Sequence, residues 1–587
     1  MTALAAGFIF QIRRCRVDHI FYRGSRAFSM NFQIILNWVP VQPLKFTLLA
    51  GGLLAGSSMI SAPAARAEGT NFVPAVKVNT SAEPVAKGKF APNWDSLKQY
   101  QVPEWFRDAK FGIWAHWGPQ CQPEDGDWYA RAMYQTGSGQ YRFHTNHYGS
   151  PKDFGFKDVI HEWKAEKWDP EKLMALYERA GAQYFFALAN HHDNFDNWDS
   201  KYQPWNSVAL GPQKDLIGGW AAAARKHGLR FGVSVHAAHA WTWYEPAQDY
   251  DGRLTKADGK GLWWEGLDPQ DLYAQNHWRS EGSTNPGKIH TQWNWGNGAS
   301  QPDQAYCDKF YNRTADLINN YHPDLIYFDD TALPLWPVSD AGLQIAAHFY
   351  NSNNRWHGRE DDGVLFGKIL DQDQRQCMAW DIERGTSNEI EPHPWQTDTC
   401  IGNWHYDRGL YERNGYKNAR TVIRMLADIV SKNGNLLLNI PVRGDGTIDE
   451  KERRVVEGIA DWMTVNKESI LGTRPWKVFG EGPASAGAKL TAQGFNEGKG
   501  KPYSAADFRF TSKGSVIYAI ELGWPTNGVS ITSLGRAAQF LDHPIDKIEL
   551  LGSKEAIQWA QTGEALAIQQ PAKQPNDIAV VYKITLR

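Results

Sequence analysis

The feature of this 587-residue chain that most constrains its fold is a repeated order of helix followed by apolar strand. The first clear unit begins with WDPEKLMALYERAG (168–181), which has an Asp-Pro start, apolar residues at helical spacing and a terminal Gly. The short apolar run YFFALAN (184–190) follows it and is typical of a buried strand. Helix–strand pairs recur at 215–227 and 230–237, 312–322 and 323–330, 341–353 and 363–370, and 418–434 and 435–442. This pattern predicts a parallel sheet with helices packed outside it.

Polar side chains gather where these predicted strands end. They are His191, His192, Asp193, His236, His239, Asp329, Asp330, Lys368 and Asn439. A (β/α)8 barrel assembles its site from the carboxyl ends of all its strands. A doubly wound sheet would gather ligands at one switch point and often carries a Gly-rich phosphate loop, and no GxGxxG or GxxxxGK[ST] follows a strand here. We therefore expect an α/β fold with a (β/α)8-like catalytic barrel.

The residue pattern changes after a further predicted helix at 450–466. Residues 475–587 contain short β-rich runs separated by Gly, Pro and Asn, which predicts an antiparallel β-sandwich. The stretch 244–305 is rich in Trp, Gly and Asn and is expected to form loops over the barrel mouth. The predicted organisation is a targeting segment at 1–67, a linker at 68–92, a catalytic domain at 93–470 and a C-terminal β-sandwich domain at 471–587.

The N-terminal region has the pattern of a secretory signal. The apolar run FTLLAGGLLAG (46–56) follows Lys45 and precedes Ala65-Arg66-Ala67, a small-x-small cleavage pattern. The run is shorter than the roughly 20 apolar residues that span a bilayer. Because it begins so late, Met30 is a better start than Met1. We expect a secreted or periplasmic protein, cleaved near Glu68, with no integral membrane association.

Charge and composition limit the classes of molecule that the chain is expected to bind. The 62 Lys and Arg against 65 Asp and Glu give a net charge of −3, which argues against a duplex nucleic-acid binder. Aromatic residues make up 13% of the chain, and flat aromatic rings are surfaces on which sugars stack, so carbohydrate is favoured as a partner. Export permits disulfides, but the sequence leaves open whether Cys121, Cys307, Cys377 and Cys400 pair or remain separate buried thiols. The oligomeric state is also left open.

The chemistry that these residues allow points to carboxylates. No GxSxG elbow is present, and no Cys occupies a convincing strand-to-helix turn. Neighbouring His191 and His192 are expected to point to opposite faces of a strand, so they are poorly placed to chelate one ion, although His236 and His239 could do so if a strand ends between them. We therefore expect no metal and no other cofactor.

Two acidic residues are the candidates for catalysis. Asp329 ends the strand PDLIYFDD, and of the two successive acids there one can cap a helix while the other acts. Glu383, in WDIERG, is expected after the next strand, GVLFGKIL; a surface ion pair with Arg384 is the plainer interpretation of a single Glu. A pair of carboxyl groups among aromatic residues is what cleavage of a glycosidic bond uses.

Six segments, in order along the chain, resemble the α-L-fucosidases of glycoside hydrolase family 29. They are WFRDAKFGIWAHWG (105–118), GDWYARAMY (126–134), LANHHDNFDNWDSKY (188–202), PDLIYFDD (323–330), WDIERG with PWQTDTCIG (380–402), and DIVSKNGNLLLNIP (428–441). The resemblance covers roughly residues 95–470, and a C-terminal β-domain is usual in that family. It implies a (β/α)8-like barrel, no metal, and hydrolysis of terminal α-linked L-fucose with retention through a fucosyl-enzyme.

Carried over position by position, the resemblance implies Asp329 as the nucleophile and Glu383 as the acid/base. Asp127 stands where many members have Glu, Tyr327 where Trp is common, and Lys368 near a position that is usually Arg. Gln396 replaces a Glu of many members, which removes a competing candidate for the acid/base; Glu389, Glu391 and Asp398 are the reserve candidates. The expected substrate-binding residues are His116, Asp127, Trp128, His191, His192, His236, Tyr327 and Lys368.

The sequence therefore predicts an exported exo-α-L-fucosidase that acts on fucosylated oligosaccharides or polysaccharides. Two alternatives remain open from the sequence. One is a non-catalytic fucose-binding protein of the same fold, and the other is a related barrel glycosidase that acts on another sugar, such as an α-galactoside. The linkage preference and the natural glycan are not determined by the sequence.

Overall fold

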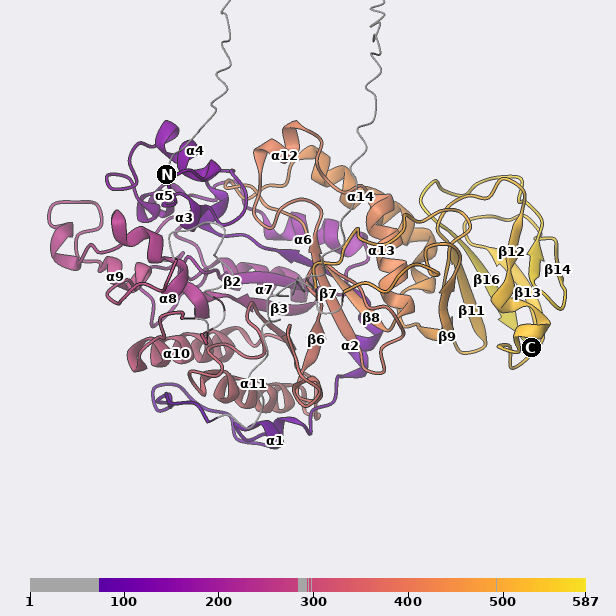
Figure 1. The fold of residues 1–587 in the computed structure, drawn as a ribbon, viewed down its shortest axis with the longest axis horizontal. Helices are drawn as coiled ribbons and strands as arrows, with labels where there is room; N and C mark the ends of the chain where they lie inside the picture. Colours follow the sequence, from indigo (N-terminus) through magenta and orange to yellow (C-terminus); the bar gives the residue numbers. More distant parts are fainter. Residues whose placement is uncertain (1–72, 283–292, 294, 297, 492–493) are drawn as a thin grey trace, which may run out of the picture. The chain divides into compact units, whose positions relative to one another are not determined.

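Eight parallel strands close into a barrel, as the sequence predicts (Figure 1). The computed structural model describes residues 73–282, 293, 295–296, 298–491 and 494–587. Hydrogen bonding runs from each strand to the next, and β8 returns to β1, where Trp114 pairs with Asn439. The barrel strands are β1 (Phe111–Ala115), β2 (Tyr184–Asn190), β3 (Arg230–Val235), β4 (Leu325–Phe328), β5 (Val364–Gly367), β6 (Ala379–Asp381), β7 (Trp395–Cys400) and β8 (Gly434–Asn439).

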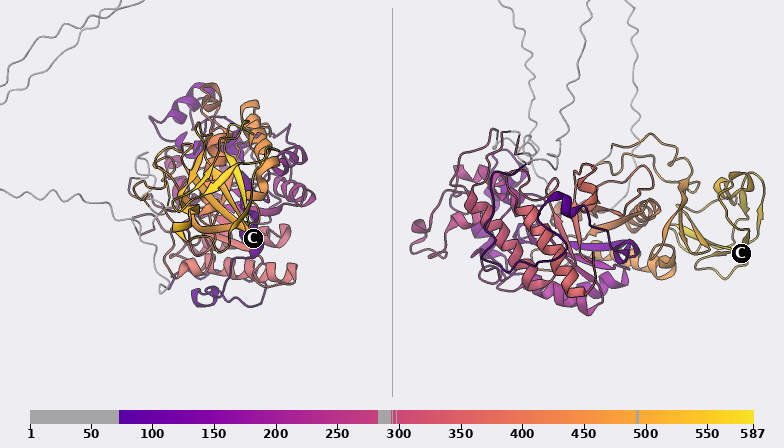
Figure 2. Two further views of the ribbon diagram at one scale, coloured as in Figure 1. Left: turned by 90° about the vertical axis from the view of Figure 1, so that its right-hand side faces the viewer. Right: turned by 90° about the horizontal axis from the view of Figure 1, so that it is seen from below.

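The predicted helices form where the capping residues and the apolar spacing indicate. In α6, Pro170 is the first residue and the Asp169 side chain accepts from the backbone N–H of Lys172. Figure 2 shows helices on the outside of the barrel in two further views. The α-helices of the described residues are α1 (Trp94–Leu97), α2 (Glu104–Ala109), α3 (Tyr129–Ala132), α4 (Gly139–His147), α5 (Phe156–Glu162), α6 (Pro170–Arg179), α7 (Leu216–Lys226), α8 (Ala240–Trp243), α9 (Pro269–Tyr273), α10 (Gln304–Tyr321), α11 (Ala341–His357), α12 (Arg408–Glu412), α13 (Ala419–Ser431) and α14 (Glu450–Asn466).

Two consecutive connections depart from the helix–strand alternation. The segments 368–378 and 382–394, after β5 and β6, contain no α-helix; the first has only the short 3-10 turn η6 (Gln374–Gln376). The expectation that Glu383 follows the strand of 363–370 is therefore wrong, because β6 lies between them. Only three residues long, β6 lacks the extended apolar run that made the longer strands recognisable in the sequence. Both segments instead bring side chains to the barrel mouth.

The barrel interior is filled by large side chains. Trp114, Tyr184, Phe186, Tyr327 and Phe366 belong to one buried cluster on the inner side of the strands. Gly112 in β1 provides the space for Tyr184, since a Cβ at that position would lie 2.2 Å from the tyrosine ring. A larger buried cluster lies between the strands and the surrounding helices. The interior is thus a packed core and not a pore.

The C-terminal region forms two antiparallel sheets, as expected for the end of the chain. A five-stranded sheet has the order β13-β16-β11-β10-β9, and a three-stranded sheet has the order β12-β15-β14. The strands are β9 (Arg474–Glu481), β10 (Phe508–Lys513), β11 (Val516–Glu521), β12 (Val529–Ile531), β13 (Ile545–Leu550), β14 (Trp559–Gln561), β15 (Leu566–Ile568) and β16 (Val580–Leu586). A separate buried apolar cluster packs these sheets together.

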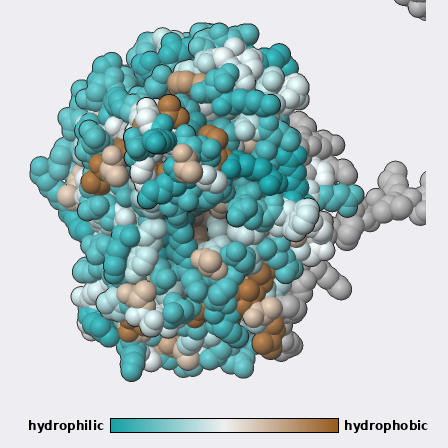
Figure 3. Space-filling view, turned by 90° about the vertical axis from the view of Figure 1, so that its left-hand side faces the viewer, coloured by the Kyte–Doolittle hydropathy of each residue, from teal (hydrophilic) through white to brown (hydrophobic). Residues whose placement is uncertain are grey.

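Several other expectations concern the surface and the termini. The predicted signal segment lies outside the described residues. Among the described residues, no helix is long and apolar enough to span a bilayer. One face of the molecule is mainly hydrophilic, with apolar residues in small scattered groups (Figure 3). Cys121, Cys307, Cys377 and Cys400 are all buried and unpaired, so the interpretation as separate thiols is confirmed.

Candidate active site

A cavity of about 300 Å³ opens at the carboxyl ends of the barrel strands. Asp329 follows β4 directly, Lys368 follows β5 directly, and Glu383 lies two residues after β6. Most of the side chains predicted for the site therefore meet in one place. The cavity is lined by Trp114, His116, Trp128, His191, His236, Trp293, Tyr327, Asp329, Asp330, Thr331, Lys368, Ile369, Glu383, Asp398, Trp404, His405 and Phe495.

Lys368 lies between the two candidate catalytic carboxyl groups. Its Nζ is 2.5 Å from Asp329 Oδ1 and 2.6 Å from Glu383 Oε2. Because one ammonium group contacts both side chains, these two oxygens are no more than roughly 5 Å apart, a separation at which a sugar's anomeric carbon and its glycosidic oxygen can be reached together. Asp330, by contrast, turns into the following loop, where it accepts from the backbone N–H of Thr331 at 2.7 Å. The expectation that one of the two successive acids caps a helix is wrong, because the next helix begins at Ala341 with Asp340 at its N-cap and Asp330 binds loop backbone instead.

Asp329 and Glu383 have opposite electrostatic properties. Burial alone would raise the pKa of Asp329, but Lys368 and the hydrogen bonds from His192 and His236 hold it well below its usual value. For Glu383, burial raises the pKa to about 7, with Asp398 and Asp329 adding to the effect and Lys368 opposing it. Near neutral pH, therefore, one carboxyl group is ionised while the other keeps its proton for much of the time.

Two histidines hold Asp329 in place. His192 Nε2 lies 3.0 Å and His236 Nδ1 lies 3.2 Å from Asp329 Oδ2. His192 Nδ1 is also 2.6 Å from the backbone oxygen of His236. Both nitrogens of His192 thus face oxygen atoms. Burial lowers the pKa of His192, and the hydrogen bond to Asp329 opposes this effect without reversing it, so near neutral pH the ring is neutral and carries a single proton.

The expectation that His191 and His192 point to opposite faces of a strand is wrong. β2 ends at Asn190, so neither residue obeys strand alternation, and both rings face the region of His236, with one nitrogen of each of the three within 4.8 Å of the others. The sequence did not reveal this because the apolar run gives no sign of where the strand ends. Strand alternation therefore no longer argues against a metal at this pair. Whether a metal could bind depends on which ring nitrogens carry a lone pair.

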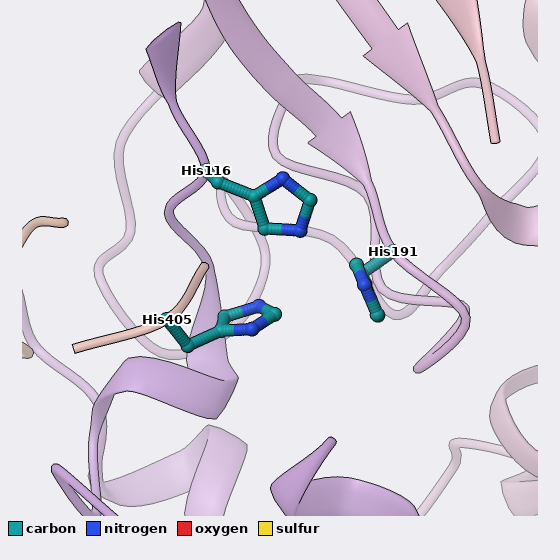
Figure 4. A group of neighbouring side chains, drawn as sticks. All are labelled: His116, His191 and His405. Atoms are coloured by element: carbon teal, nitrogen blue, oxygen red, sulfur yellow. The ribbon is translucent and has the colours of Figure 1, made fainter. Parts of the chain in front are cut away.

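A second histidine cluster faces the cavity from three elements (Figure 4). His116 follows β1, His191 follows β2 and His405 follows β7, and their ring centroids are 4.8–5.1 Å apart. Gln120 Nε2 lies 2.8 Å from His191 Nδ1, and its amide is oriented by bonds to Asp193 and the backbone N–H of Ala130. His191 Nδ1 therefore accepts a hydrogen bond from the Gln120 amide, and the neutral ring carries its own proton on Nε2.

This tautomer bears on which ligand the cluster fits. A metal ion needs a lone pair, whereas the Nε2–H of His191 is a donor that suits a hydroxyl oxygen. Burial, with the neighbouring histidines, holds the pKa of His116 and of His191 well below the usual value, so both rings are neutral. Another potential ligand group, Asp324, His357 and Asp362, has its carboxylates paired with Arg230 at 2.7 and 3.1 Å. The cluster in the cavity is better suited to sugar hydroxyls than to a metal.

Asp127 and Trp128 take different positions. Trp128 lines the cavity, with its backbone in the left-handed region at φ 61°. Asp127 does not line it; its Oδ1 accepts from the backbone N–H of His405 at 2.7 Å. Asp127 therefore supports His405 in this structure, where the resemblance implied a direct contact with a hydroxyl.

The residues that sequence reasoning missed are mostly aromatic. Trp114, Trp293, Trp404, His405 and Phe495 line the cavity. Trp114 could have been found from the sequence. It lies two residues before His116 at the end of a strand, and residues two apart in a strand face the same side. Trp404 and His405 follow the segment PWQTDTCIG at the end of β7, where a strand-end search would have found them had β7 been recognised.

Behind Glu383 lies a pair of buried aspartates. Gln396 donates to Asp381 Oδ2 at 2.8 Å, and Tyr327 donates to Asp398 Oδ2 at 2.8 Å. The remaining oxygen of each carboxyl group is buried without a donor. Burial raises the pKa of both groups, that of Asp381 well above its usual value, and the two carboxyl groups interact directly. A single proton held between them satisfies both oxygens.

A closed barrel with two carboxyl groups of opposite protonation at its mouth, surrounded by neutral histidines and tryptophans, is typical of a glycoside hydrolase. Comparison with known proteins gives the particular family. The sequence model described as alpha-L-fucosidase matches residues 77–468, and the one described as alpha-L-fucosidase C-terminal domain matches residues 501–587. The chain belongs to the α-L-fucosidase family of glycoside hydrolases, glycoside hydrolase family 29.

Individual relatives agree along most of the chain. Human tissue alpha-L-fucosidase is 26% identical over 517 residues, covering 85% of this chain and 91% of the relative. An alpha-L-fucosidase of Branchiostoma floridae is 25% identical over 515 residues, covering 85% and 95%. The solved structure of Thermotoga maritima alpha-fucosidase in complex with a mechanism-based inhibitor has a TM-score of 0.62 at 25% identity, covering 84% of this chain and 100% of that one.

Proposed function

We propose that this chain is an exported enzyme that releases terminal α-linked L-fucose from oligosaccharides or polysaccharides with retention of configuration. The observation that carries the proposal is the contact of Lys368 with both carboxyl groups, which have opposite pKa shifts. Retaining glycosidases use carboxyl groups about 5–5.5 Å apart, one ionised and one protonated. Relatives crystallised with fucose and with a mechanism-based inhibitor support the same substrate class.

The proposed reaction has two steps. In the first, Asp329 attacks the anomeric carbon and Glu383 gives its proton to the glycosidic oxygen, so the leaving sugar departs as an alcohol and a fucosyl-enzyme ester forms. In the second, Glu383 takes a proton from water, which attacks the anomeric carbon and releases Asp329. Lys368 stabilises whichever carboxylate is charged at each stage. Its contact with Asp329 must loosen as the ester forms, because the carboxylate then loses its charge.

The same pocket accounts for recognition of the sugar. His191 donates through Nε2. Both ring nitrogens of His116 and Nε2 of His405 are buried without a hydrogen-bond partner in the protein and are thus available to hydroxyls. A 6-deoxy sugar also presents a methyl group, for which Trp114, Tyr327 and Trp404 offer an apolar wall; the Trp114 ring centroid is 5.0 Å from that of Tyr327 and 5.5 Å from that of Trp404. Neutral donors beside an aromatic wall favour a neutral deoxy sugar over an acidic one.

The direct test compares aryl α-L-fucoside with aryl α-galactoside and follows the product anomer by proton NMR. We expect release from the fucoside, with α-L-fucose as the first product. Faster cleavage of the galactoside would favour a glycosidase for another sugar, and binding of fucose with no cleavage of either would favour a non-catalytic fucose-binding protein. First release of β-L-fucose would contradict retention.

Export rests on the apolar run 46–56 and on Ala65-Arg66-Ala67, all outside the described residues. We expect the mature protein to begin close to Glu68 when a culture expressing the whole chain is fractionated and the purified enzyme is sequenced from its N-terminus. As a control, Ala65→Gln with Ala67→Gln should block cleavage. An enzyme recovered from the cytoplasm with residues 30–60 intact would contradict export.

A further inference from the structure

The connection between β9 and β10 returns from the C-terminal sheets to the loop that carries Glu383. The backbone N–H of Phe495 donates to the carbonyl oxygen of Glu383 at 2.7 Å, and that of Glu497 donates to the carbonyl oxygen of Arg384 at 2.8 Å. Between them, Asn496 accepts from the backbone N–H of Thr386 at 2.9 Å and donates to its oxygen at 3.0 Å. A segment far along the chain is thus joined to the acid/base loop by four hydrogen bonds.

Phe495 has a conformation and an exposure that packing alone does not explain. Its backbone is in the left-handed region at φ 51°, which L residues with bulky side chains seldom adopt. Its side chain is 56% exposed, whereas Asn496 beside it is 1% exposed. The anchored neighbour holds the backbone, and the phenyl ring is left facing solvent. Strain kept in this way beside a catalytic group is a reason to look for a ligand.

The position of Phe495 relative to Glu383 indicates which part of a substrate it meets. Fucose would occupy the deep end of the cavity, among the buried rings of His116, His191 and His236. Glu383 gives its proton to the glycosidic oxygen, so the leaving sugar lies beyond Glu383 on the solvent side. Phe495 lines the cavity, is bonded to the backbone of Glu383 and is exposed, so it lies on that side.

A second cavity of about 310 Å³ shares Phe495 as a wall. Its polar lining comes from Arg384, Lys417 and Glu497, and Glu497 is held by Lys417 at 2.6 Å and by the Thr399 hydroxyl at 2.6 Å. A fixed carboxylate and a guanidinium beside an exposed aromatic ring combine stacking with hydrogen bonding. That combination suits a pyranose ring, which has an apolar face and hydroxyls at its edge.

We propose that Phe495 and the cavity lined by Arg384 and Glu497 form the binding site for the neutral sugar from which fucose is cleaved. This inference rests on the proposed function. The site makes the region between the two C-terminal strands β9 and β10 a part of substrate selection. It also links leaving-group binding to the loop that carries Glu383, because the same backbone hydrogen bonds hold Phe495 and that loop together.

The test compares Phe495→Ala with the parent enzyme on two substrates. One is α-L-fucosyl fluoride, whose leaving group has no ring to stack; the other is whichever of α1,2-, α1,3- and α1,6-linked fucosyl disaccharides the parent enzyme cleaves best. We expect kcat/KM to fall about tenfold on the disaccharide, the size of one aromatic stacking contact, and to stay within about twofold on the fluoride. Phe495→Tyr should keep both activities. Trp278→Ala removes an exposed ring that lines neither cavity, and should change neither activity.

Each other outcome has a distinct meaning. An equal loss on fluoride and disaccharide would overturn the inference, because Phe495 would then act through Glu383 or the fucose pocket. No loss on either would overturn it as well. If the parent enzyme cleaved no fucoside at all, the proposed function would fail instead, and that is measured before any variant is made. Thermal unfolding of each variant shows whether it is folded.

Discussion

The two sides of the catalytic cavity are built differently, although both place a carboxyl group at a strand end. On the side of β2, β3 and β4, Asp329 is surrounded by donors: His192, His236 and Lys368. On the side of β6 and β7, Glu383 has Lys368 as a donor, and Asp398 lies near it as a second acid. Both groups are carboxyls at the end of a barrel strand, but their neighbours differ.

This difference explains how the two carboxyl groups come to have different protonation states and so different roles. Donors stabilise the charge of Asp329, while burial and nearby acid disfavour the charge of Glu383. Lys368 is common to both sides and therefore cannot be the source of the contrast. The histidines on one side and the aspartate pair on the other must supply it, and each can be removed separately.

The largest effect is expected from Asp329→Gly. Without the carboxylate no fucosyl-enzyme can form, so kcat/KM should fall by more than roughly 1,000-fold on glycans and activated fucosides alike. The measurement is the hydrolysis rate of an aryl fucoside and of a fucosyl disaccharide, with calorimetric binding of fucose as the control for an intact pocket. A variant that keeps a tenth of the parent rate would remove Asp329 from the role of nucleophile.

Glu383→Ala should have a smaller effect that depends on the substrate. Loss of an acid catalyst costs roughly 100- to 10,000-fold on a natural glycan. An aryl fucoside with a good leaving group needs little protonation in its first step, so it should lose far less. Added azide should then take the place of water, attack the trapped fucosyl-enzyme and give α-L-fucosyl azide, since this anion needs no general base.

The same proportional loss on both substrates, with no effect of azide, would show that Glu383 is not the acid/base. Of the reserve candidates, Asp398 lines the cavity, whereas Glu391 binds the Ser387 hydroxyl instead. Asp398→Ala would then be the next variant to test, and Asp329 would keep its role.

The pH profile sharpens the contrast between the two sides. Glu383 acts as an acid, so kcat/KM should fall as pH rises through its pKa of about 7. Asp329 acts in its ionised form, and its pKa is held well below the usual value, so activity should persist into acidic pH. Asp398 raises the pKa of Glu383. In Asp398→Asn, the pH at which kcat/KM falls on the alkaline side should therefore be lower by some tenths of a unit to about one unit.

Asp381→Asn is the matched control for that variant. Its amide can donate to Asp398 in place of the shared proton, so Asp398 stays charged and the alkaline limb should remain in place. Equal shifts in both variants would mean that the aspartate pair acts on Glu383 as a structural unit and not through the charge of Asp398. Thermal unfolding of both variants separates a change in titration from a loss of packing.

Much of the fold was predictable because long apolar strands leave a clear pattern. The run YFFALAN coincides with β2, and α14 spans the predicted residues 450–466, with a capping box formed by Asp449 and Glu452 at its start. The strands β1, β6 and β7 were not among the predicted strands. β6 has three residues, and β7, WQTDTC, is polar because its inward side chains form the buried network of Gln396 and Asp398. A hydrophobic pattern cannot show a strand whose interior side is made of hydrogen bonds.

The site was predictable only where it follows a recognised strand or a family motif. Asp329, Lys368 and the histidines after β2 were found in this way. Phe495 was not, because it comes from a connection over 100 residues beyond Glu383 in the chain and meets it only through backbone bonds. The placement of Asp127 beneath His405 was missed for a similar reason, since it is a side-chain bond to a backbone group that no motif records.

The smallest expected effect is that of removing metal ions. The notion of His236 and His239 as a ligand pair is not supported by their contacts, since His236 meets Asp329 at 3.2 Å and His239 meets Asp330 at 3.3 Å. In the other cluster, Gln120 fixes the proton of His191 on the nitrogen that a metal would need. Activity on an aryl fucoside should therefore be unchanged after dialysis against EDTA.

Gln120→Glu sharpens the test, because a carboxylate there would accept a hydrogen bond from Nδ1–H of His191 and so favour the tautomer whose Nε2 lone pair faces the cavity. That variant should become sensitive to added zinc, with zinc acting as an inhibitor competitive with fucose, while the parent enzyme is less affected. A loss of parent activity in EDTA that zinc restores would instead make the histidines ligands of a catalytic ion and overturn the carboxylate mechanism.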